Sequence, residues 1–218
     1  MKLLVPPQSG SVSGQTASRN RFGQYMRSRA IPVNPASAAQ GTVRARLAAN
    51  SAAWRLLTSA QRAGWSDLGL SMVRSDSLGQ SYSLQGNQAY ASVNNNRLLS
   101  GLAVVADAPG IVTPVSLVTV TITLTAASLS IAYTATPLAA ATYLAVFASP
   151  QRSAGRNFEG DFRFVKLSAA AAVSPLVALT EYTAKFGVPV VGNRIFFSLV
   201  TITLGFESGP FITSAVVA

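Results

Sequence analysis

The sequence predicts an α+β protein with an extended basic N-terminal arm, a small helical region and a C-terminal antiparallel β-sandwich. The first 35 residues are rich in Pro, Gly, Ser and Arg, a composition typical of an extended segment. Apolar residues then recur at helical spacing as far as the stretch DAPG (107–110), and beyond it they alternate with a period of two. We therefore expect an arm over 1–35, a helical domain over 36–107 and a β-sandwich over 108–218.

The arm carries a cluster of uncompensated positive charge. The segment SRNRFGQYMRSRAIPVNP (18–35) contains four arginines and two aromatic residues, and the first acidic residue of the chain is Asp67. Guanidinium groups bind carboxylates or phosphates in bidentate fashion. The residues predicted to contact neighbouring subunits or phosphates are Arg19, Arg21, Phe22, Tyr25, Arg27, Arg29, Arg44 and Arg46.

Nucleic acid, an anionic membrane and an acidic protein surface are the three partners that suit such charge. The net charge is +10, of which +8 falls in 1–107 (11 Lys/Arg, 3 Asp/Glu) and +2 in 108–218 (6 and 4). The chain has no motif that reads a DNA groove and few lysines, which favours docking onto acidic patches of neighbouring subunits. Contact with DNA is the alternative, and it would weaken steeply with salt.

Composition argues against catalysis. The chain has no cysteine and no histidine, and only 7 acidic residues among 218. This excludes thiolate and histidine ligands for metals and every histidine-dependent triad. We expect a protein that is not an enzyme and that uses no metal and no cofactor. Charged residues make up only 11%, which fits either a Ser/Thr/Asn-rich surface or a surface covered by other subunits.

The region from residue 36 predicts three amphipathic helices. One apolar stripe begins at Val43 and continues to Leu57 at 3.6 residues per turn. Thr58 and Gln61 have the spacing of a capping box, which predicts that a second helix starts there and runs to about Leu70. A third helix is expected over 87–102. The predicted core residues of these helices are Val43, Leu47, Trp54, Leu57, Trp65 and Tyr90.

The second half contains no charged residue from 108 to 151, yet its pattern favours a sheet over a membrane helix. VTVTITLT (118–125) alternates strictly between β-branched or apolar residues and threonines, as a half-buried strand does. The chain also lacks the aromatic girdles of a membrane barrel. Further strands are expected at 129–133, 142–149, 162–168, 194–204 and 211–218, with one short helix within 176–187. This number of short strands is typical of an immunoglobulin or fibronectin type III-like sandwich, and the lack of cysteine favours the fibronectin-like form.

Two runs of sequence resemble a family of proteins encoded among the structural genes of tailed bacteriophages and prophages. They are RFGQYMRSRAIPVNPASAAQGTVRARLAANSAAWRLLTSAQRAGW (21–65) and GNQAYASVNNNRLLSGL (86–102). The shared features are a basic stretch before x-P-x-N-P, a Q-x-x-V-R helix start, A-W-x-x-L-T-x-x-Q-R-x-x-W, and N-x-A-[FY]-x-x-x-N-x-N. The stretches YLAVFASPQRSAGRNF (143–158) and YTAKFG (182–187) look like the β-sandwich that often accompanies them.

The resemblance implies a non-enzymatic structural component of a virion, located in the head, neck or tail. Its expected partners are other virion proteins, with a homo-oligomer inside a larger assembly, possible contact with packaged DNA, and no membrane. The arm and helices would anchor the chain to neighbouring subunits, and the β-sandwich would project or make further contacts. The alternative function is nucleic-acid binding through the basic arm.

Overall fold

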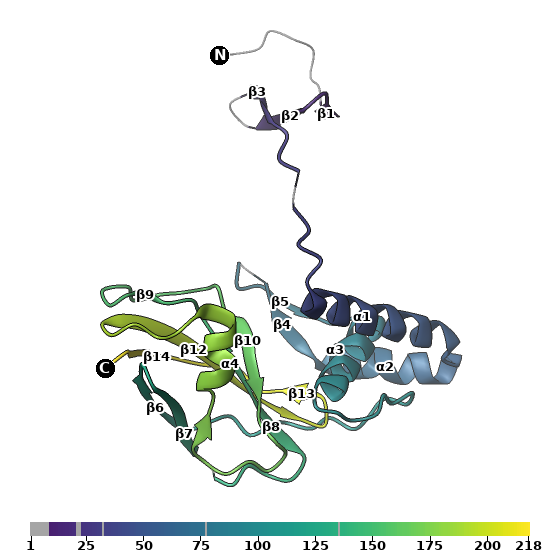
Figure 1. Ribbon diagram of the computed structural model, residues 1–218. Helices are drawn as coiled ribbons and strands as arrows, with labels where there is room; N and C mark the ends of the chain where they lie inside the picture. The colour runs from purple at the N-terminus through teal and green to yellow at the C-terminus, as the bar shows by residue number, and fades with distance from the viewer. Residues whose placement is uncertain (1–8, 21–22, 32, 77, 135) are drawn as a thin grey trace. The chain divides into compact units, whose positions relative to one another are not determined.

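The structure is a computed structural model of the chain, and it describes residues 9–20, 23–31, 33–76, 78–134 and 136–218 (Figure 1). The chain divides into two compact units, Met1–Thr42 and Val43–Ala218, and each is described separately. The predicted boundaries lie after residues 35 and 107, whereas this division lies after Thr42, within the first helix, and groups the rest of that helix and the later helices with the later strands.

The first unit contains a small antiparallel sheet in the order β1-β2-β3. Its strands are β1 (Gly10–Val12), β2 (Gln15–Asn20) and β3 (Gly23–Ser28). Ser13 and Gly14, between the first two strands, both have positive φ, 45° and 78°, as a tight two-residue hairpin turn requires. The sequence predicts an extended arm here, but this part of the chain folds back on itself.

The predicted helices are present. They are α1 (Ala38–Leu56), α2 (Ser59–Ser71) and α3 (Gly86–Leu99), and the short strands β4 (Val73–Ser75) and β5 (Ser81–Ser83) lie between the last two. The hydroxyl of Thr58 accepts the backbone N–H of Gln61 at 3.3 Å, and the Gln61 side chain accepts the backbone N–H of Thr58 at 2.9 Å. The predicted capping box is therefore confirmed.

A small aromatic core holds the helices together. Trp65 and Tyr90 are fully buried, and their ring centroids lie 5.1 Å apart in an edge-on contact. Trp54 and Leu57 are half-buried against this core, and the Trp54 ring lies 5.6 Å from that of Tyr90. These four residues confirm the predicted core. The indole N–H of Trp65 donates to the carbonyl of Ala106 at 2.7 Å, so its polar atom is also satisfied.

Two predicted core residues were assigned wrongly, since Val43 and Leu47 are 63% and 50% exposed. They continue the stripe of Trp54 and Leu57 toward the start of α1. Only the end of α1, with Ala53 and Trp54, and Leu57 just after the helix pack against the aromatic core. The stripe was therefore located correctly, but its first turns have no cover among the described residues.

The second half of the chain is rich in strands, as predicted. The elements are β6 (Thr119–Thr125), β7 (Ser128–Thr134), β8 (Thr142–Ala148), β9 (Arg152–Ser153), β10 (Arg163–Leu167), β11 (Leu176–Val177), α4 (Leu179–Phe186), β12 (Asn193–Thr203), β13 (Phe206–Glu207) and β14 (Phe211–Val216). The predicted helix within 176–187 is the short strand β11 followed by α4. With its helices and antiparallel sheets, the chain has the predicted α+β class.

These strands form two antiparallel sheets that share one core. One sheet has the order β11-β7-β6, and the other has the order β10-β8-β12, with β9, β13 and β14 also paired to β12 (Figure 1). Leu129 and Ile131 from the first sheet and Val146, Ile195 and Phe197 from the second are fully buried in one cluster. Their inward positions follow from the period of two along each strand.

The helices and sheets of the second unit are joined through the turn between β12 and β13. Phe206, just after this turn, is buried in the aromatic core of the helices. Asn96 on α3 donates to the carbonyl of Gly205 at 3.0 Å. Asn94, its neighbour on α3, exchanges two hydrogen bonds with the backbone of Val105, at 2.9 and 3.2 Å. The asparagines of α3 thus fasten neighbouring backbone segments to the helix.

Candidate interaction surface

The predicted contact residues of the arm lie on both faces of the small sheet. In the register of β2 and β3, Arg19 lies opposite Gln24, and Tyr25 lies opposite Ser18. Side chains alternate between faces along a strand, so Tyr25 and Arg27 share one face and Arg19 is on the other. Arg29 follows β3, and its backbone N–H donates to the carbonyl of Gly14 at 2.7 Å. Arg21 and Phe22 lie outside the described residues.

The small sheet has no core of its own among the residues that the structure describes there. No side chain assessed in 9–37 is buried, and the largest apolar ones, Tyr25 and Met26, are 39% and 43% exposed. A sheet of short strands needs an apolar face packed against something to be stable on its own. The described side chains of this sheet therefore supply little packing of their own.

The positive charge of the first unit has no internal counter-charge. Residues 1–42 contain five Lys/Arg and no Asp/Glu. Arg19, Arg27 and Arg29 are exposed, and none of them forms an ion pair within the described part of the chain. Four of the seven acidic residues form ion pairs with Lys or Arg of the second unit: Glu159, Asp161, Glu181 and Glu207. The exposed arginines of the first unit therefore present positive charge to solvent, with no acidic residue in 1–42 to balance it.

The exposed start of the α1 stripe forms a second potential contact. At 3.6 residues per turn, Arg44 and Arg46 lie on either side of the line through Val43 and Leu47. A groove of about 300 Å³ continues this line between α1 and α3. Its lining residues are Leu47, Asn50, Ser51, Trp54, Asn87, Gln88, Tyr90 and Ala91. This combination of an apolar strip, amide side chains and flanking arginines suits a protein contact.

The groove was not predicted from the sequence, although one residue of α1 pointed to a contact there. Asn50 is buried on the apolar stripe of α1, and its side-chain amide donates to the Asn95 side chain on α3 at 2.8 Å. A polar residue in the middle of an apolar stripe commonly marks a point where a neighbouring element supplies a hydrogen bond. The partner on α3 is 45 residues away in sequence, so periodicity within α1 could not identify it.

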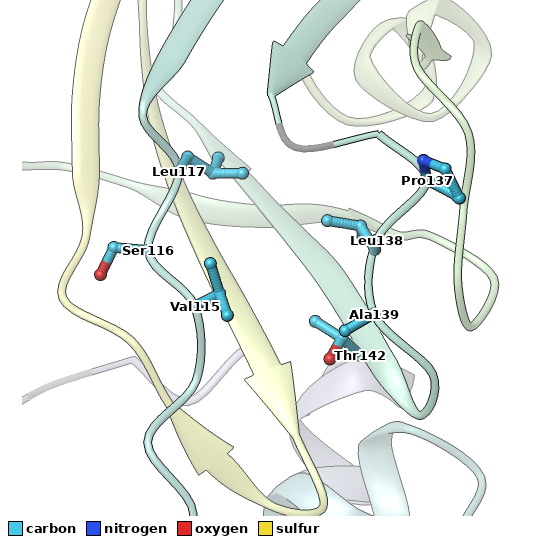
Figure 2. A pocket seen from close by; sticks show the side chains of 7 residues that line it. All are labelled: Val115, Ser116, Leu117, Pro137, Leu138, Ala139 and Thr142. Atoms are coloured by element: carbon cyan, nitrogen blue, oxygen red, sulfur yellow. The ribbon is translucent and has the colours of Figure 1, made fainter.

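A separate pocket of about 190 Å³ opens between the segment before β6 and the loop before β8 (Figure 2). Leu117 and Leu138 extend into the space between these two segments, and Val115 lies beside them (Figure 2). The remaining lining residues are Ser116, Pro137, Ala139 and Thr142. None of the lining side chains titrates, so the pocket supplies packing surface and no acid or base.

The described residues contain neither a metal-binding cluster nor a membrane-spanning helix. No group of three or more acidic side chains there could hold a metal ion. No helix of that part of the chain has the length and apolar character needed to cross a membrane.

Comparisons with protein-family models, with curated proteins and with solved structures give no match to this chain.

Proposed function

We propose that this protein is a non-enzymatic structural component of a bacteriophage virion, in the head, neck or tail. The basic N-terminal unit and the start of α1 anchor it to neighbouring subunits. The two-sheet region projects or makes further contacts. The motifs that resemble phage structural proteins support this assignment. The exposed basic sheet of the first unit and the exposed apolar residues at the start of α1 also support it.

One observation carries the proposal: the described part of the first unit has a sheet without a buried core, and residues 1–42 contain arginines and no acidic residue. Its described residues bury no side chain, and Arg19, Arg27 and Arg29 are all exposed. A segment of this kind gains stability when its strands and charges are covered by another protein. In an assembled particle, acidic patches of neighbouring subunits supply that cover.

The two-sheet region fits an immunoglobulin or fibronectin type III-like sandwich, which is the second part of the proposal. The supporting facts are the sheet orders β11-β7-β6 and β10-β8-β12-β14 and the single core between them. Sandwiches of this architecture present loops at both ends, which commonly serve as binding surfaces. Such a region is a rigid module for contacts outside the anchoring segment.

Nucleic-acid binding is the alternative function, and the same charge supports it. A segment with five cations and no acid attracts phosphates as well as carboxylates. The two functions differ in how binding responds to lysine. Phosphate attraction is preserved when arginine is replaced by lysine, whereas a bidentate pair with a carboxylate loses much of its geometry.

The test compares two double variants of exposed arginines, Arg27→Glu/Arg29→Glu and Arg27→Lys/Arg29→Lys. We expect the Glu variant to be recovered in purified particles at less than about one-tenth of the wild-type level, because each reversed charge faces a carboxylate of the neighbour. The Lys variant, which keeps the net charge, should be incorporated at an intermediate level. The measurement is the ratio of variant to major particle protein by quantitative mass spectrometry.

Binding to a short random-sequence DNA duplex is measured in parallel. If the alternative holds, the wild type and the Lys variant bind this duplex equally well, and affinity falls by orders of magnitude between roughly 50 and 200 mM salt. Normal incorporation of the Glu variant into particles would contradict the proposed anchoring role.

A further inference from the structure

Two neighbouring loops at one end of the two-sheet region expose large apolar side chains. One loop, 154–162, connects β9 to β10 and contains Phe158, which is 76% exposed. The other, 187–192, connects α4 to β12 and contains three exposed valines: Val188, Val190 and Val191. Scattered exposed apolar residues are common on proteins, whereas a group of them on anchored loops marks a contact surface.

Hydrogen bonds hold both loops to the same point of the sheet. β9 pairs with the start of β12, where Arg152 lies opposite Arg194. The guanidinium of Arg194 donates to the carbonyl of Arg156 in the first loop at 3.0 Å. The side chain of Gln151, just before β9, donates to the carbonyl of Val188 at 2.7 Å and accepts the N–H of Val190 at 2.8 Å. The two loops therefore lie beside one another.

Glu159 fixes the backbone next to Phe158. Its side chain is only 4% exposed and forms ion pairs with Arg152 and with Arg156, the latter at 3.4 Å. Its carboxylate also accepts the backbone N–H groups of Gly160 and Asp161 at 3.0 and 3.1 Å. The hydrogen bond from Asp161 and that from Arg152 lower the pKa of Glu159 to about 2. The carboxylate is thus ionised at neutral pH and fixes the backbone at Gly160 and Asp161 through these hydrogen bonds.

The charge around the exposed side chains is positive. Arg152 and Arg156 both pair with the carboxylate of Glu159, and Asp161 is paired with Arg163 at 3.0 Å. Arg194 adds a further positive charge, and its guanidinium donates to the carbonyl of Arg156. These four arginines and two acids leave a net charge of +2 at this end. A surface with an apolar centre and a cationic rim is complementary to an apolar pocket bordered by carboxylates.

We propose that this loop surface, formed by Phe158, Val188, Val190 and Val191 with the flanking arginines Arg152, Arg156 and Arg194, binds a partner protein. The partner offers an apolar pocket for Phe158 with carboxylates at its edge. Phe158 is the central contact, because aromatic and arginine side chains dominate the binding energy of protein interfaces. Anchoring the loops before binding reduces the conformational entropy lost on association. The surface lies in the second unit and does not depend on the anchoring role proposed for the first.

The test selects binders from a library of random displayed peptides, using the full chain as the target. We expect the enriched peptides to carry apolar residues together with Asp or Glu. Synthetic copies of these peptides should bind the Phe158→Ala variant at least about thirty-fold more weakly than the wild type. The control is Leu78→Ala, which removes another exposed apolar side chain in the loop between β4 and β5 and should leave affinity unchanged.

Three results would overturn this proposal. They are a lack of enrichment, enrichment of neutral or basic peptides, and equal binding of the peptides to wild type and Phe158→Ala. Binding of the chain to phosphatidylcholine–phosphatidylglycerol vesicles that is lost in Phe158→Ala would also overturn it, in favour of a lipid surface. Because particles play no part in this experiment, its failure is distinguishable from failure of the virion assignment.

Glu159 is a positioning residue for this surface, and Glu159→Gln tests that role. The variant should bind the selected peptides more weakly than the wild type while Phe158 is still present. Amide hydrogen exchange at Gly160 and Asp161 should accelerate, because their acceptor loses its charge. Unchanged exchange at both amides together with unchanged affinity would contradict the positioning role.

Discussion

Replacing Trp65 by alanine is expected to lower the free energy of unfolding by about 3–5 kcal/mol. The side chain is fully buried, packs edge-on against Tyr90 at 5.1 Å and donates its indole N–H to the carbonyl of Ala106 at 2.7 Å. Alanine leaves a cavity in the small aromatic core and removes the donor from a carbonyl there. The core has too few side chains to rearrange and fill this cavity. The loss of stability is therefore expected at the upper end of the range for large-to-small substitutions in cores.

Urea-induced unfolding followed by circular dichroism measures this effect. Two controls bracket it. Trp54→Ala should lower the free energy of unfolding by less, because Trp54 is only half-buried at the edge of the same core. Leu70→Ala, at a residue that is 68% exposed, should change it by no more than about 0.5 kcal/mol. A cost below about 1 kcal/mol for Trp65→Ala would mean that the aromatic core does not hold the helices together.

Gly205→Ala should destabilise the chain by roughly 2–5 kcal/mol, through backbone strain and overpacking together. Gly205 has φ of 100° and lies in the turn between β12 and β13. A Cβ atom at this position would lie 2.6 Å from the carbonyl oxygen of Val93 on α3. The turn would have to move away from α3, which would also disturb Phe206 in the aromatic core and the hydrogen bond from Asn96.

Two other glycines separate these causes. At Gly101, φ is 73° and nothing lies within 4 Å of a Cβ, so Gly101→Ala measures strain alone, about 1 kcal/mol. Gly209 has neither positive φ nor a close neighbour, and Gly209→Ala should be nearly neutral. If Gly205→Ala lowered the free energy of unfolding no more than Gly209→Ala, the contact of this turn with α3 would be absent. The helices and sheets would then not form one unit.

Elements with local sequence signals were predicted well. The capping box of Thr58 and Gln61 depends on two side chains three residues apart, and the alternation in 118–125 depends on the pleat of a single strand. Each signal lies within one element, so it requires no knowledge of the rest of the chain. The strand positions in the second half followed from the same kind of pattern.

Features that depend on distant contacts were not predictable in this way. The apolar stripe showed which face of α1 is apolar but not how far α3 covers it, which is why Val43 and Leu47 were placed in the core. The sheet of the first unit was not predicted, because a Pro/Gly/Ser-rich composition suggested an extended arm. Ser13-Gly14, however, is a turn signal. The role of Glu159 in positioning its loop could not be predicted from the sequence. It depends on the pairing of β9 with β12, which brings Arg152, Arg156 and Arg194 to the same loop.

Limited trypsin digestion with mass spectrometry, on the free chain and on assembled particles, tests whether the first unit anchors the chain to neighbouring subunits. Arg19 and Arg27, in the small sheet, and Arg29, just after it, are exposed cleavage sites, and the sheet has no core within the described residues. We expect rapid cleavage after these residues in the free chain and protection in the particle, with the second unit resistant in both. Equal cleavage in both states would contradict an anchoring role for the first unit, and protection that requires added DNA and disappears at high salt would favour nucleic-acid binding instead.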